Sequence, residues 1–179
     1  MNNIEIMGVL NITDNSFHDG GKYNSFKESL QHAKEMIHEG ADIIDIGAES
    51  SKPGSDPVSS NDQIKKIEPV VDAIREVSDI PISIDTRSSD VIKKLTKYKI
   101  NIVNDISSLR DMELIDIIKE NNLMVSLMHM QGVPKNMQDN PTYDDVVSEV
   151  YSYLENKVNL CESSGINTVS YTHLRAHET

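Results

Sequence analysis

Short apolar runs alternate with amphipathic stretches along most of this chain. The apolar runs are continuous, which is typical of parallel strands that are covered on both faces. The stretches between them carry apolar residues three or four positions apart, as helices with one buried face do. This pattern predicts strands at residues 4–12, 42–47, 81–85, 100–104 and 123–129, each followed by a helix.

Helix start signals follow several of the predicted strands. Ser25-x-x-Glu28 and Ser60-x-x-Gln63 have the form of capping boxes that begin helices. Pro69 is expected to kink the second helix or to mark its true start. Asp111 can cap the fourth helix, and a long fifth helix is expected over residues 142–165, ending at a glycine.

Successive strand–helix units predict an α/β protein with a parallel sheet. Two architectures fit, a closed eight-unit barrel and an open doubly wound sheet, but the glycine-rich nucleotide motifs of the open sheet are absent from the sequence. Polar residues stand at or just after the predicted strand ends, and in a barrel these ends converge on one active-site mouth. We therefore expect a (β/α)8 TIM-barrel type. These strand-end residues are Asn11, Glu49, Asp85, Asn104 and His129.

The length of the chain accommodates only part of such a barrel. Five units occupy residues 1–165, so eight would need about 264 residues, close to the roughly 250 that are typical. We expect about five and a half units, with a sixth strand starting at Ile166-Asn167. Residues 1–167 are thus predicted to be a partial barrel. Residues 168–179 show neither strand nor helix amphipathicity and are expected to be a non-native tail.

Composition and charge narrow the function classes. The chain has 29 acidic against 17 basic residues and a formal net charge of −12, which argues against a nucleic-acid partner. A phosphate-bearing ligand would then need local cations. No apolar run approaches the roughly 18 residues of a membrane span, so a soluble protein is expected. The single cysteine, Cys161, fits a reducing compartment, with the cytoplasm as the expected location.

Four segments carry candidate chemistry. The run of turn formers over residues 11–21 is either a surface loop or, because of its length, a functional one. The loop over residues 47–55 is either solvated or an anion cradle containing Lys52. Asp85 and Asn104 either form hydrogen bonds with neighbouring groups at the strand ends or bind a polar ligand such as a nitrogen heterocycle. His129 alone is more often structural, and the His173-x-x-x-His177 spacing is assigned no metal.

Several short motifs follow one another in a distinctive order along the chain. They are Met7–Thr13, Ser16-Phe17, Asp19–Gly21, Glu49-Ser50, Pro53-Gly54, Ile84–Thr86, Asn104–Ile106, Met128–Gly132 and Asn140–Tyr143. Together they resemble the dihydropteroate synthase family, over residues 4 to about 167. The resemblance implies a (β/α)8 barrel transferase of folate biosynthesis, a homodimer when full length. Such an enzyme joins (7,8-dihydropterin-6-yl)methyl diphosphate to p-aminobenzoate and releases diphosphate, with Mg²⁺.

The resemblance also implies roles for single residues. Asn11 would help to hold the magnesium–diphosphate group. The pterin ring would contact Asp85, Asn104, Ile106 and Met128. Phe17 and Pro53 would enclose p-aminobenzoate, while Ser51 and Lys52 would be catalytic and face the diphosphate.

The sequence departs from the family pattern in ways that leave alternatives open. Lys52 stands where the family usually has arginine, Asp14-Asn15 replaces the common Pro-Asp, and the family's later ligands would lie beyond residue 167. A non-catalytic fragment or pterin-binding module is one alternative, and the 179-residue chain alone is expected to be inactive. A pterin-dependent methyltransferase of the same barrel type is another, although the two loop motifs favour the synthase.

Overall fold

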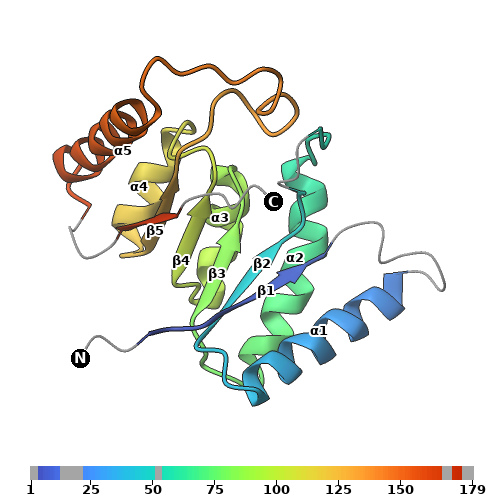
Figure 1. Cartoon of the computed structure of the whole chain (residues 1–179). Coiled ribbons are helices and arrows are strands. Elements are labelled where there is room, and N and C mark those ends of the chain that lie inside the picture. Colours follow the sequence, from blue (N-terminus) through green and yellow to red (C-terminus); the bar gives the residue numbers. More distant parts are fainter. Residues whose placement is uncertain (1–3, 13–21, 51–53, 167–170, 175–179) are drawn as a thin grey trace.

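The computed structural model describes residues 4–12, 22–50, 54–166 and 171–174. Within these ranges six parallel strands form one sheet in the order of the sequence (Figure 1). Every strand lies beside its predecessor, which requires a crossover between each pair. The strands are β1 (Met7–Asn11), β2 (Ile43–Gly47), β3 (Ile82–Asp85), β4 (Ile102–Asp105), β5 (Met124–Met128) and β6 (Tyr171–Leu174).

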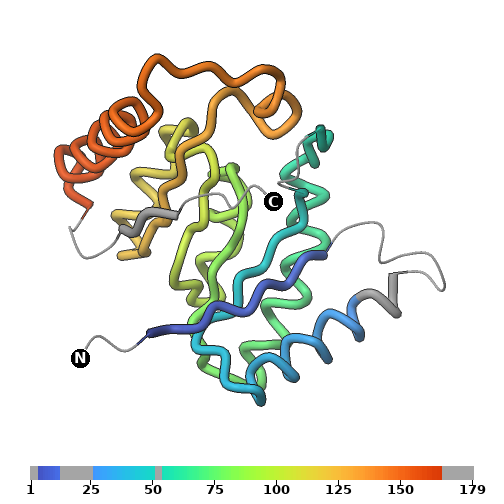
Figure 2. Tube along the Cα trace, in the orientation of Figure 1, coloured from blue at the N-terminus to red at the C-terminus, as the bar shows by residue number. Residues whose placement is uncertain are grey.

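The crossovers are helical, and the chain alternates strand and helix along its length (Figure 2). The expected α/β class is therefore confirmed, and the order of the sheet is that of consecutive units of a (β/α) barrel. The helices are α1 (Lys22–His38), α2 (Ser60–Arg75), α3 (Ser89–Leu95), α4 (Glu113–Glu120) and α5 (Val146–Ser163), with a short 3₁₀ helix, η2 (Thr96–Tyr98).

The two faces of the sheet differ in polarity. A Cβ added at Gly8 would meet Met36 of α1 and Ile44 of β2, so Gly8 and Ile44 lie on the face that the helices cover. This outer face and the helices form a continuous aliphatic core in which Ile44, Ile46 and Ile84 are fully buried. Because side chains alternate along a strand, the residues between these isoleucines point to the inner face.

The first two helices begin at different residues from those expected. α1 starts at Lys22, so the Ser25-x-x-Glu28 segment lies inside the helix and does not cap it. The N-cap of α2 is Ser59, whose side chain accepts a hydrogen bond from the Asp62 backbone N–H. This cap starts the helix well before Pro69, so Pro69 does not mark its start. Pro69 is exposed, and the helix continues through it.

The later helices differ in how their free N–H groups are met, since the N-cap residues of α3 and α4, Ser88 and Met112, form no side-chain capping hydrogen bond. Asp111, expected to cap the fourth helix, lies one residue before its N-cap, although it accepts a hydrogen bond from Glu113 N at 3.2 Å. The fifth helix does not begin at Thr142, because Asp145 is its N-cap and its side chain accepts hydrogen bonds from Val147 N and Ser148 N. Its end agrees with expectation, since Gly165 has a φ of 82° just after the helix.

The sixth strand does not lie where it was expected. Ile166 N donates to Cys161 O at 2.9 Å and so closes the turn after α5, while β6 lies at Tyr171–Leu174. Residues 171–174 belong to the stretch that lacks strand amphipathicity in the sequence, yet they pair with β5 in parallel register. Backbone groups on a sheet edge can pair whatever the side-chain periodicity. The non-native origin of residues 168–179 stays a prediction.

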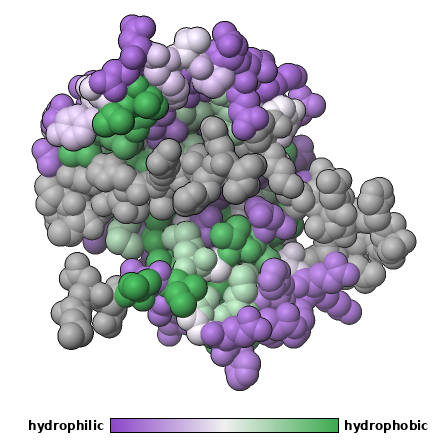
Figure 3. All heavy atoms as spheres, in the orientation of Figure 1, coloured by the Kyte–Doolittle hydropathy of each residue, from purple (hydrophilic) through white to green (hydrophobic). Residues whose placement is uncertain are grey.

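The inner face is uncovered beside β1. Val9 is on this face and is 54% exposed, and Ile4 and Ile6 before the strand are exposed as well. Apolar side chains are in view in this part of the surface (Figure 3). None of the helices within the described ranges is long and apolar enough to cross a membrane.

Candidate functional site at the strand ends

The carboxyl ends of the strands bring the predicted site residues into one row. We call this end of the sheet, with the loops that follow β1 to β5, the mouth. The register places Asn11 beside Gly47, Gly47 beside Asp85, and Asp85 beside Asn104. The row continues to Ser126 on β5. Three residues expected to bind ligand, Asn11, Asp85 and Asn104, therefore lie on adjacent or nearly adjacent strands of the inner face.

Gly47 makes room for the carboxylate beside it. A Cβ at this position would lie 3.2 Å from Asp85 Cβ and 3.3 Å from Asp85 Oδ2. A larger residue would force the Asp85 side chain to give by a few tenths of an ångström, so the glycine lets the carboxylate lie close beside β2 on the inner face.

The layer below this row is also polar. Asn104 Nδ2 donates a hydrogen bond of 3.1 Å to Asp45 Oδ2, which joins β4 to β2. In the part of the chain that the structure describes, three buried oxygens have no hydrogen-bond partner: Asp45 Oδ1, Ser83 Oγ and Ser126 Oγ. All three side chains are on the inner face. Buried polar atoms are almost always paired, so this face is built to meet a polar ligand or water.

The acidic groups of the inner face alter each other's protonation. Burial, together with the neighbouring carboxylates of Asp45, Glu49 and Asp105, raises the pKa of Asp85 to about 7. Burial also raises the pKa of Asp45. Asp85 can therefore exist near neutral pH either as a charged acceptor or as a neutral donor.

A partly buried ion pair lies at the mouth beyond Asp85. Arg87 donates from Nη2 to Glu49 Oε1 at 2.7 Å and from Nε to Glu49 Oε2 at 3.1 Å. Glu49 Oε1 also accepts from Val58 N at 3.0 Å, ahead of α2. The sequence patterns single out Glu49 and not Arg87. The position of Arg87, two residues after Asp85 at the end of the same predicted strand, was the signal in the sequence that could have identified it.

The remaining predicted residues of β4 and β5 surround the row. Asp105 accepts hydrogen bonds from Ser107 and Leu109, so its carboxylate orders the loop after β4. Ile106 and Met128 are half-buried. The ring of His129 packs against Tyr153 with 5.0 Å between the ring centroids, and burial lowers its pKa. This packing supports the structural interpretation of His129.

The loops after β2 and β5 touch each other at the mouth. Gly54 N donates to Pro134 O at 3.0 Å, and Lys135 Nζ lies 2.8 Å from Asp56 Oδ1. Four predicted site residues lie outside the described residues, and their roles stay predictions. They are Phe17, Ser51, Lys52 and Pro53.

No cluster of three or more His, Cys, Asp or Glu residues that could hold a metal occurs among the described residues. Asn11 is exposed at the end of β1, in the row described above. Magnesium usually takes few protein ligands and completes its shell with waters and substrate phosphates. A single side-chain oxygen at Asn11 is compatible with that mode of binding.

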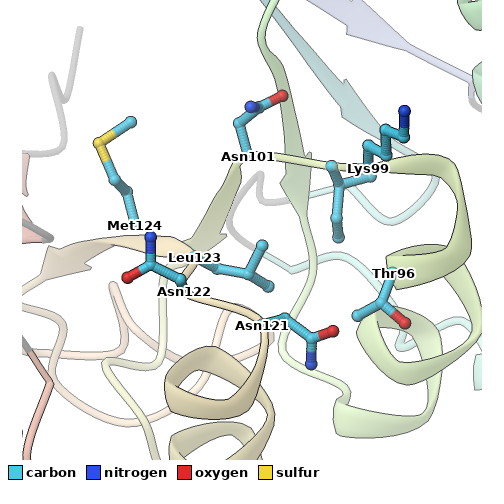
Figure 4. Close-up of a pocket in the computed structure, with 8 residues that line it drawn as sticks. Thr96, Lys99, Asn101, Asn121, Asn122, Leu123 and Met124 are labelled. Atoms are coloured by element: carbon cyan, nitrogen blue, oxygen red, sulfur yellow. The ribbon is translucent and has the colours of Figure 1, made fainter.

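A hollow at the opposite end of the strands is a different feature (Figure 4). It has a volume of about 430 Å³ and lies where β4 and β5 begin. Two of its three asparagines have structural partners: Asn101 Oδ1 accepts from Arg75 and from Ile82 N, and Asn121 Nδ2 donates to Ile117 O. The polar row of the inner face, not this hollow, is therefore the candidate site.

Comparisons with known proteins show what this chain is similar to. The family model described as pterin binding enzyme matches residues 7–170. The dihydropteroate synthase of Escherichia coli K12 is 44% identical over 161 residues, which are 90% of this chain and 57% of that protein. A Yersinia pestis dihydropteroate synthase in complex with a sulfonamide drug superposes with a TM-score of 0.86 at 37% identity, covering 94% of this chain and 62% of that one. A Xanthomonas albilineans dihydropteroate synthase with 4-aminobenzoic acid gives 0.85 at 31% identity, covering 94% and 60%. The chain thus spans a little over half the length of these relatives.

Proposed function

Since this chain belongs to the pterin-binding enzyme family, we propose that it forms part of a dihydropteroate synthase. The protein would be a transferase that joins (7,8-dihydropterin-6-yl)methyl diphosphate to p-aminobenzoate. The observation that carries this proposal is the row of Asn11, Asp85 and Asn104 on the inner face, above buried oxygens that have no described partner.

The row suits the pterin ring because its free groups are mainly acceptors. One N–H of Asn104 is engaged by Asp45, which fixes the orientation of the amide. The Asn104 carbonyl and the Asp85 carboxylate can then accept hydrogen bonds from the amino group and ring N–H of a pterin. Ile106 and Met128, half-buried beside the row, would contact the flat faces of the ring.

The reaction places few demands on the protein besides orientation. The aniline nitrogen of p-aminobenzoate attacks the methylene carbon of the pterin, the bond to the diphosphate oxygen breaks, and diphosphate leaves. Holding the two substrates in line supplies much of the acceleration. We propose that Ser51 and Lys52 face the leaving diphosphate and that Phe17 and Pro53 enclose p-aminobenzoate, as the family resemblance implies.

Magnesium and assembly belong to the same proposal. Asn11 would hold Mg²⁺ through its side-chain oxygen, and the ion when bound would neutralise charge on the diphosphate. A homodimeric full-length protein and a cytoplasmic location are further parts of the proposal. The buried free thiol of Cys161 supports a reducing compartment.

The alternatives are less well supported. The curated and structural relatives reported above are dihydropteroate synthases, which favours that activity over a pterin-dependent methyltransferase. The same relatives disfavour a purely binding module, because their match extends over 90% or more of this chain.

The test is turnover by the full-length protein, followed as diphosphate release with both substrates present. Asn104→Ala should raise the KM for the pterin diphosphate at least about tenfold, since a half-buried acceptor is lost. Asn121→Ala is the matched control, because Asn121 is exposed at the other end of the strands. Binding of both substrates without any product would contradict the proposed reaction. Asn11→Ala should raise the Mg²⁺ concentration that is needed for half-maximal rate.

A further inference from the structure

The mouth is strongly acidic, although the substrates proposed above are anions. The carboxylates of Asp45, Glu49 and Asp105 all act on Asp85 and raise its pKa. Among the described residues, Arg87 is a cation that opposes them, and it lowers the pKa of Asp85 and of Asp105. Arg87 follows the end of β3 by two residues and its guanidinium contacts Glu49, which follows the end of β2, so it lies at the mouth.

Glu49 holds this guanidinium in one orientation. The pair is bidentate, with distances of 2.7 and 3.1 Å, and the Glu49 side chain is 9% exposed. Both Glu49 oxygens are already engaged, one by Arg87 alone and one by Arg87 and Val58 N. Glu49 is thus not available to bind a ligand or to transfer a proton, and its contact with Arg87 is a positioning one.

The guanidinium itself keeps free donors. Arginine carries five N–H groups, and the contact with Glu49 uses one on Nε and one on Nη2. Within the described ranges Nη1 forms no hydrogen bond, and the Arg87 side chain is 25% exposed. A guanidinium held on one side by a carboxylate presents its other edge to a second oxyanion.

We propose that Arg87, positioned by Glu49, binds an oxyanion of the substrates at the mouth. The inference rests on the proposed function and adds to it a residue that lies outside the motifs of the family resemblance. The oxyanion is either the diphosphate or the carboxylate of p-aminobenzoate, since both present paired oxygens to a guanidinium. A negatively charged mouth needs such a cation to admit either group.

The experiment uses the full-length protein and three probes. Calorimetry gives the Kd of inorganic diphosphate and of uncharged 6-hydroxymethylpterin, and diphosphate release gives the KM of p-aminobenzoate. The variants are Arg87→Met, Arg87→Lys and Glu49→Gln. Lys65→Met is the matched charge control, because Lys65 is 71% exposed on α2 and pairs only with Asp62 among the described residues.

Arg87→Met should weaken binding of one or both anions at least about tenfold, the range for a lost hydrogen bond to a charged group. If only the Kd of diphosphate rises, Arg87 contacts the leaving group. If only the KM of p-aminobenzoate rises, Arg87 contacts the carboxylate. Arg87→Lys should weaken anion binding less than Arg87→Met does, because the positive charge remains. The Kd and KM values of Glu49→Gln should lie between those of wild type and those of Arg87→Met. The Kd of 6-hydroxymethylpterin should change less than the values for the affected anion, because Arg87 acts on this ligand only through the pKa of Asp85. All values for Lys65→Met should stay unchanged.

Two results would overturn the inference. One is wild-type values for both anions in Arg87→Met, and the other is an equal loss for the uncharged pterin, which would show a merely structural role. Failure of the proposed function has a different signature, namely a wild-type protein that neither binds 6-hydroxymethylpterin nor forms dihydropteroate. Binding of inorganic diphosphate would still report on Arg87 in that case.

Discussion

Replacement of Asp85 by asparagine should separate stability from ligand binding. The structure holds this carboxyl group on the inner face, where burial and three neighbouring carboxylates raise its pKa from 3.8 to about 7. Folding therefore favours the protonated form of Asp85. At a pH above 7 the folded protein must keep a charge there that its surroundings disfavour.

The sign follows from the number of protons bound in each state. Between about pH 4 and pH 7 the folded state binds a proton at Asp85 and the unfolded state does not, so stability falls as pH rises. Each pKa unit corresponds to about 1.4 kcal/mol, which sets an upper limit of about 4 kcal/mol for the whole interval. Between about pH 5 and pH 8 we expect Asp85 to account for a loss of about 2–3 kcal/mol.

Urea unfolding of the full-length protein at these two pH values checks the expectation. Wild type should lose stability as pH rises by about 2–3 kcal/mol more than Asp85→Asn does, because asparagine does not titrate. Other acidic groups contribute to both proteins and largely cancel in the difference. Parallel pH profiles for the two proteins would refute the reasoning about burial and charge.

The same variant should weaken ligand binding. The Asp85→Asn side chain would lack the negative charge that the proposed pterin contact uses, at a cost of about 1.5–3 kcal/mol. The effect should be far larger for the pterin than for p-aminobenzoate, because only the ring donors face this position. Small and equal effects on both ligands would contradict the assignment of Asp85 to the pterin ring.

Two further predictions concern the loop after β2 and the end of α2. Lys52→Ala should raise the KM for the pterin diphosphate and lower kcat, while Lys52→Arg should retain activity, since a cation near the leaving group stabilises charge that grows in the transition state. Steady-state kinetics checks this, and unchanged KM and kcat in Lys52→Ala would assign the role to other cations. Arg75→Met should lower the free energy of unfolding by about 3 kcal/mol without changing the pterin Kd, because Arg75 donates to four backbone carbonyls and to Asn101 at the end opposite the mouth. Urea unfolding beside Lys65→Met checks it, and an unchanged midpoint would contradict it.

Local periodicity was enough to predict the elements and their class. Continuous apolar runs separated by amphipathic helices allow little other than a parallel α/β sheet, because both faces of each strand must be covered. The row of Asn11, Asp85 and Asn104 also followed from the sequence, since parallel strands of matched length end at one edge. Exact helix starts did not follow, because Ser59 and Asp145 compete with nearby residues of equal capping ability.

Only the tertiary structure decided which side chains act on one another. The contact between Asn104 and Asp45 joins residues 59 positions apart, and that between Arg87 and Glu49 joins residues 38 positions apart. The raised pKa of Asp85 depends on three carboxylates from two other stretches of the chain and on burial that no local pattern records. A sequence determines the element that carries each polar residue, whereas the distances between elements determine its charge, its partners and the side of the molecule on which it can meet a ligand.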